Sequence, residues 1–166
     1  MKSIILIQKI FSGRKLASLG FIWLLIITIM ALAAPLIAPF DPLEIDPIAR
    51  LSEPGFPYFF GTDHFGRDSF SRAVFGARMA IIIGMGSVFV ALVAGGLVGM
   101  LSAYFTRLGN IMMRGVDVLM AFPALLLALV LMTLLERSVT NTILVIGIVY
   151  ATTTAHILFG VTLKLR

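Results

Sequence analysis

The chain has 166 residues, of which 60% are hydrophobic and only 13% are charged, and its mean hydropathy is +1.07. Soluble globular domains are nearer half apolar and a quarter charged, so this composition excludes an ordinary cytosolic enzyme as well as a disordered chain. The sequence has no cysteine, which excludes a disulfide scaffold, and a net charge of +5 is too small to indicate a nucleic-acid binder.

Four stretches of the chain lack Asp, Glu, Lys and Arg, and each is about as long as a membrane-spanning helix. They cover residues 16–40, 79–106, 118–135 and 138–163. A helix needs roughly 20 apolar residues to cross the hydrocarbon core of a bilayer, and these stretches are apolar on all sides. The sequence therefore predicts an all-α integral membrane protein with about four transmembrane helices.

Basic residues mark the predicted cytoplasmic side of the membrane. They precede the first stretch, separate the second from the third, and follow the fourth: Lys2, Lys9, Arg14, Lys15, Arg107, Arg114, Lys164 and Arg166. All acidic residues except Asp117 fall on the opposite side. The positive-inside rule then places both chain ends in the cytoplasm, with residues 1–15 as a cytoplasmic N-terminal segment.

The first stretch has a second interpretation as a cleaved signal peptide. It combines a basic start, an apolar run over residues 19–30 and a small-x-small sequence at residues 31–33. The apolar run continues past Pro35 and Pro39 to Phe40, which favours an uncleaved first transmembrane helix over residues 16–40.

Residues 41–78 are predicted to form a loop on the outer side, with an interfacial helix near its end. Six of the seven prolines lie between Pro35 and Pro57, so the first half of the loop is expected to be extended and irregular. In the second half, Asp68 and Arg72 are four residues apart, and we expect them to pair on one helix face that leads into the second span.

Small residues recur every fourth position along the second span. They are Ser87, Ala91, Gly95, Gly99 and Ala103. Small residues at this spacing let two helix backbones approach closely in a membrane, so the stripe predicts helix packing, against a sister span.

The third and fourth spans hold the few polar groups at membrane depth. Asp117 has two interpretations: a polar group on a transport path, or an acid near a helix N-terminus, paired with Arg114. Pro123 predicts a kink in the third span. The fourth span contains several threonines and His156, and an intramembrane enzyme would have to use Asp117 with His156.

Motifs for nucleotide and metal chemistry are missing from the sequence. It has no Gly-Lys-Ser/Thr phosphate loop and no dinucleotide-type glycine fingerprint. With no cysteine and with His64 and His156 predicted on opposite sides of the membrane, no metal site is expected. The sequence therefore predicts that the chain is not an enzyme.

Three segments, taken in order, resemble a known transporter family. They read Gly61-Thr-Asp-His-Phe-Gly-Arg-Asp-Ser-Phe-Ser-Arg, then Gly76-Ala-Arg, then Arg114-Gly-Val-Asp-Val-Leu-Met-Ala-Phe-Pro-Ala-Leu-Leu-Leu-Ala after the glycine-rich span. They are similar to the inner-membrane permease subunits of bacterial dipeptide, oligopeptide and nickel ABC importers. The match is to the C-type subunit and covers most of the chain, from about residue 15 onward.

The resemblance implies the first part of a six-helix type I ABC importer permease, a multi-pass protein of the bacterial inner membrane. Residues 41–78 would be its periplasmic loop, and residues 79–166 the N-terminal part of the permease core with transmembrane helices 2–4. The implied partners are a second permease subunit, cytoplasmic ABC ATPases, a periplasmic substrate-binding protein and the lipid bilayer. ATP would be used by partner subunits, no cofactor would be bound by this chain, and the solute would be a peptide or a related small molecule.

Two features depart from the family pattern. Family members carry an ATPase-docking loop between their fourth and fifth helices, and Arg166 stands where that loop would begin, so we expect a chain truncated before it. His156 and Phe159 also stand where family members tend to carry basic residues. Both departures bear on coupling to an ATPase.

The resemblance places a family motif at the outer entrance, and it identifies no substrate-binding residue. The motif residues are Gly61, Thr62, Asp63, Gly66, Arg67, Asp68 and Arg72.

The alternative function is a self-standing four-helix membrane scaffold or assembly protein. That alternative explains the composition but not the motifs in their order.

Overall fold

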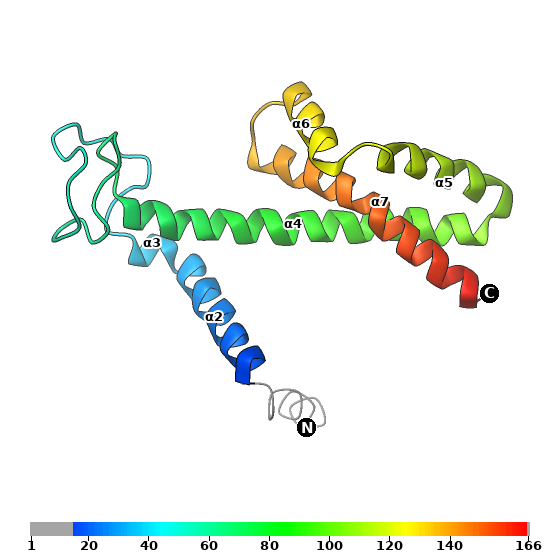
Figure 1. The fold of residues 1–166 in the computed structure, drawn as a ribbon, viewed down its shortest axis with the longest axis horizontal. Helices are drawn as coiled ribbons and strands as arrows, with labels where there is room; N and C mark the ends of the chain where they lie inside the picture. Colours follow the sequence, from blue (N-terminus) through cyan, green and yellow to red (C-terminus); the bar gives the residue numbers. More distant parts are fainter. Residues whose placement is uncertain (1–14, 166) are drawn as a thin grey trace. The chain divides into compact units, whose positions relative to one another are not determined.

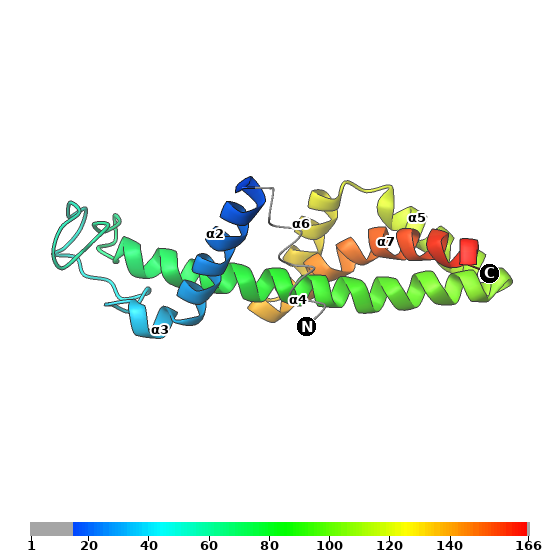
Figure 2. The same ribbon diagram turned by 90° about the horizontal axis from the view of Figure 1, so that it is seen from below.

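The structure is a computed structural model that describes residues 15–165 (Figures 1 and 2). Within this range its regular elements are all helices, residues 38–68 form an irregular loop, and the only extended pairing is an isolated bridge between Thr62 and Asp68. The predicted all-α class is confirmed for these residues. The chain divides into two compact units between Ile81 and Ile82. Most of the predicted cytoplasmic segment 1–15 lies outside the described residues.

The first unit begins with helix α2 (Lys15–Leu32), followed by the short helix α3 (Ala34–Ile37). Pro35 lies in the first turn of α3, where its missing N–H costs nothing. Ala38 is extended because the following Pro39 disfavours helical backbone. The prediction of one helix over residues 16–40 is therefore wrong at its end, where the prolines break it.

Helix α4 (Ser69–Tyr104) is the longest element, with 36 residues. At 1.5 Å per residue it is about 54 Å long, which exceeds the roughly 30 Å of a bilayer core. The expected interfacial helix is not a separate element, because the helix that starts at Ser69 continues without a break into the second span. Its later part, from Ile82 onward, belongs to the second unit.

The second unit also holds helices α5 (Thr106–Met120), α6 (Ala124–Leu134) and α7 (Val139–Leu165). The third predicted span, residues 118–135, is not one continuous helix, because the chain bends by 92° between α5 and α6. Pro123, the N-cap residue of α6, lacks an N–H and disfavours helical backbone at Phe122. The predicted kink is therefore a complete break, visible in both views (Figures 1 and 2).

Two of the described helices, α4 and α7, are long and apolar enough to cross a membrane. The bent pair α5–α6 would be a third if it forms one span. A small buried cluster of Met113, Val116 and Ala155 joins α5 to α7. Most large apolar side chains are exposed instead, for example Met85 at 72% and Phe89 at 68% on α4. Such a surface fits lipid or partner helices rather than water.

Candidate functional site

Two glycines shape the loop that carries the predicted entrance motif. Gly61 and Gly66 have φ values of +68° and +77°, a backbone region that side chains with a Cβ rarely adopt. A Cβ on Gly61 would lie 2.5 Å from the backbone oxygen of Ser52, and one on Gly66 would collide with the backbone of Asp46. The motif therefore requires glycine at both positions, where the two halves of the loop meet.

Thr62 fastens these halves together. Its buried hydroxyl donates a hydrogen bond to the carbonyl of Ala49 and accepts one from the N–H of Ser52 at 2.8 Å. The N–H of Thr62 also donates to the carbonyl of Ser52 at 3.1 Å. The proline-rich first half of the loop is thus held by backbone and hydroxyl hydrogen bonds.

Asp63 is the acceptor at the centre of the motif. Its Oδ1 accepts hydrogen bonds from the N–H groups of Phe65 (2.8 Å) and Arg67 (3.1 Å). Its Oδ2 accepts from Nε of Arg67 at 2.9 Å and forms ion pairs with both Arg67 and Arg72. Partial desolvation acts to raise the pKa of Asp63, but the bonds and positive charge of Arg67 outweigh it and hold the pKa well below its usual range.

Asp68 caps helix α4 instead of pairing with Arg72. Its side chain is only 2% exposed, and Oδ2 accepts a hydrogen bond from the N–H of Ser71 at 2.7 Å, as an N-cap residue does. The predicted Asp68–Arg72 pair is therefore wrong. The N-cap geometry turns the Asp68 carboxylate toward the backbone at the helix start, and Arg72 reaches Asp63.

The small-residue stripe of α4 lies against α7. Ser87 Oγ donates a hydrogen bond to the carbonyl of Ile143 at 3.3 Å. A Cβ on Gly95 would lie 2.8 Å from Cβ of Thr154, and one on Gly99 would lie 3.1 Å from the carbonyl carbon of Ala155. The remaining members, Ala91 and Ala103, are buried. The two helices approach so closely here that a methyl group does not fit between them at either glycine.

Asp117 lies in the last turn of α5, so the second of its two interpretations, an acid near a helix N-terminus, is wrong. Helix α5 starts at Thr106, well before the apolar stretch 118–135, and the residues that precede this stretch form an amphipathic helix. Oδ1 of Asp117 lies 2.8 Å from Nε2 of His156 on α7. Both side chains are substantially exposed. The structure thus brings together Asp117 and His156, two residues 39 positions apart in sequence.

Comparison with known proteins gives a consistent result. Residues 6–54 match the model of the N-terminal TM domain of oligopeptide transport permease C. The chain is 37% identical over 146 residues to the di/tripeptide transport system permease protein DppC of Pseudomonas aeruginosa, covering 84% of this chain and 48% of that protein. It is 34% identical over 157 residues to the oligopeptide transport system permease protein OppC of Bacillus subtilis, covering 94% and 52%.

The chain is therefore similar to peptide transport permeases. It is also 36% identical over 146 residues to the dipeptide transport system permease protein DppC of Haemophilus influenzae, covering 84% of this chain and 50% of that protein. The chain therefore spans about half the length of the curated relatives it matches. Its apolar helices and these permease relatives indicate a membrane protein.

Sequence reasoning missed several residues of this chain that the structure places at contacts. On α7, Gly147, Ala151 and Ala155 form a small-residue face opposite the stripe of α4. Their spacing of four residues is readable in the sequence.

In the loop, Tyr58 donates a hydrogen bond to Oδ2 of Asp46 at 3.4 Å, and its ring stacks on Phe40. No sequence pattern indicates that contact.

Proposed function

We propose that this chain is a membrane-spanning permease component of an ATP-driven ABC importer for peptides or a related small solute. The observation that carries the proposal is the 31–38% identity to peptide transport permeases over 82–98% of the chain. The geometry supports it, because α4 and α7 pack through small residues while exposing large apolar side chains to their surroundings.

The proposed topology has four spans in the bacterial inner membrane, with both ends in the cytoplasm. Helix α2, helix α4, the bent pair α5–α6 and helix α7 would be the four crossings. The excess of Lys and Arg at the chain ends and on α5 supports this orientation through the positive-inside rule. The loop with the Gly61–Arg72 motif would then face the periplasm and shape the outer entrance.

The proposed division of labour leaves the chemistry to other subunits. Cytoplasmic ABC ATPases would hydrolyse ATP, a second permease subunit would complete the path, and a periplasmic binding protein would deliver the solute. This chain would bind no cofactor and contribute helices that alternate between inward-open and outward-open packing. The two scaffold and enzyme alternatives gain no support from the relatives, which are transport permeases.

Co-purification from the native host tests the proposal. The affinity-tagged chain is expressed at chromosomal level in a strain that retains the neighbouring transporter genes, and membranes are solubilised in mild detergent. We expect a second permease and an ABC ATPase to co-purify, and deletion of the chain to abolish ATP-dependent uptake of a labelled dipeptide by whole cells. Accumulation as a stable homo-oligomer without either partner, with uptake unchanged on deletion, would support the scaffold instead.

A further inference from the structure

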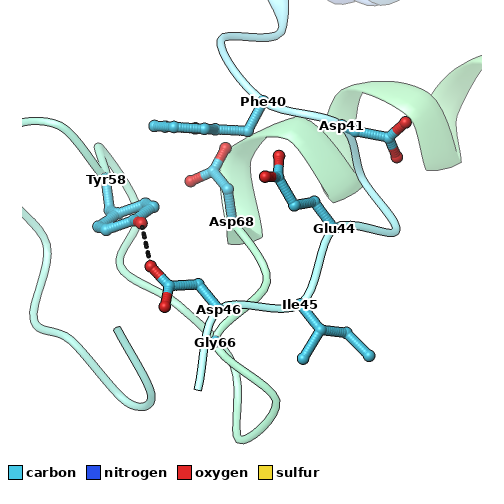
Figure 3. A pocket seen from close by; sticks show the side chains of 8 residues that line it. All are labelled: Phe40, Asp41, Glu44, Ile45, Asp46, Tyr58, Gly66 and Asp68. Carbon is cyan, nitrogen blue, oxygen red and sulfur yellow. Dashed lines mark hydrogen bonds between the residues drawn. The ribbon is translucent and has the colours of Figure 1, made fainter. Parts of the chain in front are cut away.

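The first unit contains an acidic pocket beside the N-terminus of α4. The cavity has a volume of about 370 Å³ (Figure 3). Half of the residues that line it carry a carboxylate and none is basic: Phe40, Asp41, Glu44, Ile45, Asp46, Tyr58, Gly66 and Asp68. The structure therefore gathers four acidic side chains from two parts of the loop around one space.

Asp68 is the deepest of these carboxylates and is incompletely satisfied. Its Oδ2 accepts the capping hydrogen bond from Ser71, but its buried Oδ1 has no partner among the residues that the structure describes. In the close-up, the carboxylates of Glu44 and Asp68 point toward Phe40 (Figure 3). A buried carboxylate oxygen without a donor is unfavourable, so the pocket lacks a positively charged or donating group at this position.

The other two acids are already engaged by the loop. Asp41 Oδ1 accepts a hydrogen bond from the N–H of Leu43 at 2.8 Å, and Asp46 Oδ1 accepts one from the N–H of Ile48 at 3.0 Å. Their negative charge still adds to the field in the pocket. Glu44, exposed at the pocket, and the buried Oδ1 of Asp68 are the groups available to a ligand.

The aromatic wall of the pocket favours an organic cation. The rings of Phe40 and Tyr58 stack with their centroids 5.0 Å apart, and ring faces attract ammonium and guanidinium groups. Desolvation and the negative charge of Asp46 raise the pKa of Tyr58, so its phenol stays neutral. A divalent metal fits less well, because no three His, Cys, Asp or Glu side chains among the described residues are placed so that they could hold one metal ion together.

We propose that this pocket binds an organic cation, a primary ammonium or a guanidinium group, held between Glu44 and Asp68 over the aromatic wall. Such a group supplies N–H donors to the unpaired Oδ1 and neutralises part of the carboxylate charge. Either the amino end of a small peptide or a basic side chain on a partner protein carries this chemistry.

Direct binding to the full chain in lipid nanodiscs tests the proposal without any transport assay, so its outcome is independent of the proposed function. Saturation-transfer NMR with ethylammonium and methylguanidinium is expected to show saturable binding. Glu44→Gln and Asp68→Asn each remove a negative charge, and Asn retains an oxygen that can cap α4. Each variant is expected to weaken binding about tenfold, whereas Glu53→Gln, an exposed acid of the same loop outside the pocket, leaves it unchanged.

Further probes identify the source of the cation. Binding of triglycine with a free amino end, but not of acetylated triglycine, indicates a peptide terminus. Equal binding of Nα-acetyl-lysine amide indicates a basic side chain. The proposal is overturned if neither small cation binds the wild-type chain, if the Glu44→Gln/Asp68→Asn double variant binds them as the wild type does, or if Ca²⁺ displaces them at micromolar concentration.

Discussion

Replacing Gly95 by alanine tests whether the close approach of α4 and α7 stabilises this chain. The new methyl group would collide with the carbonyl oxygen of Ala151, and it would lie 2.8 Å from Cβ of Thr154 and 3.1 Å from the carbonyl carbon of Ala151. Ordinary contacts of a Cβ begin near 3.4 Å, so the two helices must separate by at least about 0.6 Å. None of these three atoms can yield by a simple side-chain rotation, because one is a Cβ and the other two are backbone.

The cost follows from the contacts that this separation loosens. A gap of roughly 0.5–1 Å forfeits about a quarter to a half of the attraction in each affected contact, and overpacking a well-packed interface costs about 1–3 kcal/mol. Alanine also favours the helix over glycine by roughly 0.5–1 kcal/mol. Gly84→Ala, on the same helix with no atom within 4 Å of its new Cβ, carries the same helix preference and serves as the control.

The measurement is the free energy of unfolding of the full chain in mixed micelles, from SDS titration followed by circular dichroism. We expect Gly95→Ala to be about 1–3 kcal/mol less stable than Gly84→Ala, since the helix preference cancels between them. Equal stability of the two variants would refute the close-packing argument for the stripe.

Three further predictions concern the polar contacts. Asp63→Asn removes a carboxylate whose pKa is depressed below the ordinary 3.8. The stability that this carboxylate contributes is present above pH 3.8 and is lost as the pH falls toward the depressed pKa. The difference in unfolding free energy between wild type and variant should therefore shrink in acid. Asp68→Ala should destabilise the chain by about 0.5–2 kcal/mol through loss of the N-cap, and Asp68→Asn by much less, both measured by thermal unfolding. His156→Ala should cost less than about 1 kcal/mol by SDS titration, because its contact with Asp117 is exposed; a larger loss would show that the pair holds α5 on α7.

The helical class followed from composition, but the path of the chain through the third span did not. Absence of charge over residues 118–135 predicts a continuous apolar helix, and local propensity gives no reason to break it before Pro123. The structure instead extends α5 back to Thr106 and bends by 92° before α6. A count of charges does not predict the earlier start of α5, because an amphipathic helix that contains Arg107 and Asp117 cannot be distinguished from a connecting loop by its charges alone.

The loop motif shows the same limit at the level of single contacts. Glycine at positions 61 and 66 and a helix start near Asp68 are local signals, and the sequence carries them. The partner of Arg72 is not local, because two acids lie within its reach and only folding decides between them. Asp68 is used by the first turn of α4, so the guanidinium pairs with Asp63, nine residues away.

The small-residue stripe of α4 predicts close helix packing, but it does not by itself predict which helix packs against it. Small residues every four positions indicate that some backbone comes close, yet the stripe is equally compatible with a helix of another subunit. The partner is decided by α7, where Gly147, Ala151 and Ala155 repeat the same spacing, and Gly147 lies against Val90 and Ser87. A small face on one helix therefore predicts close approach, and a second small face at matching spacing predicts which helix approaches it. In this chain the sequence contains both faces, on α4 and on α7.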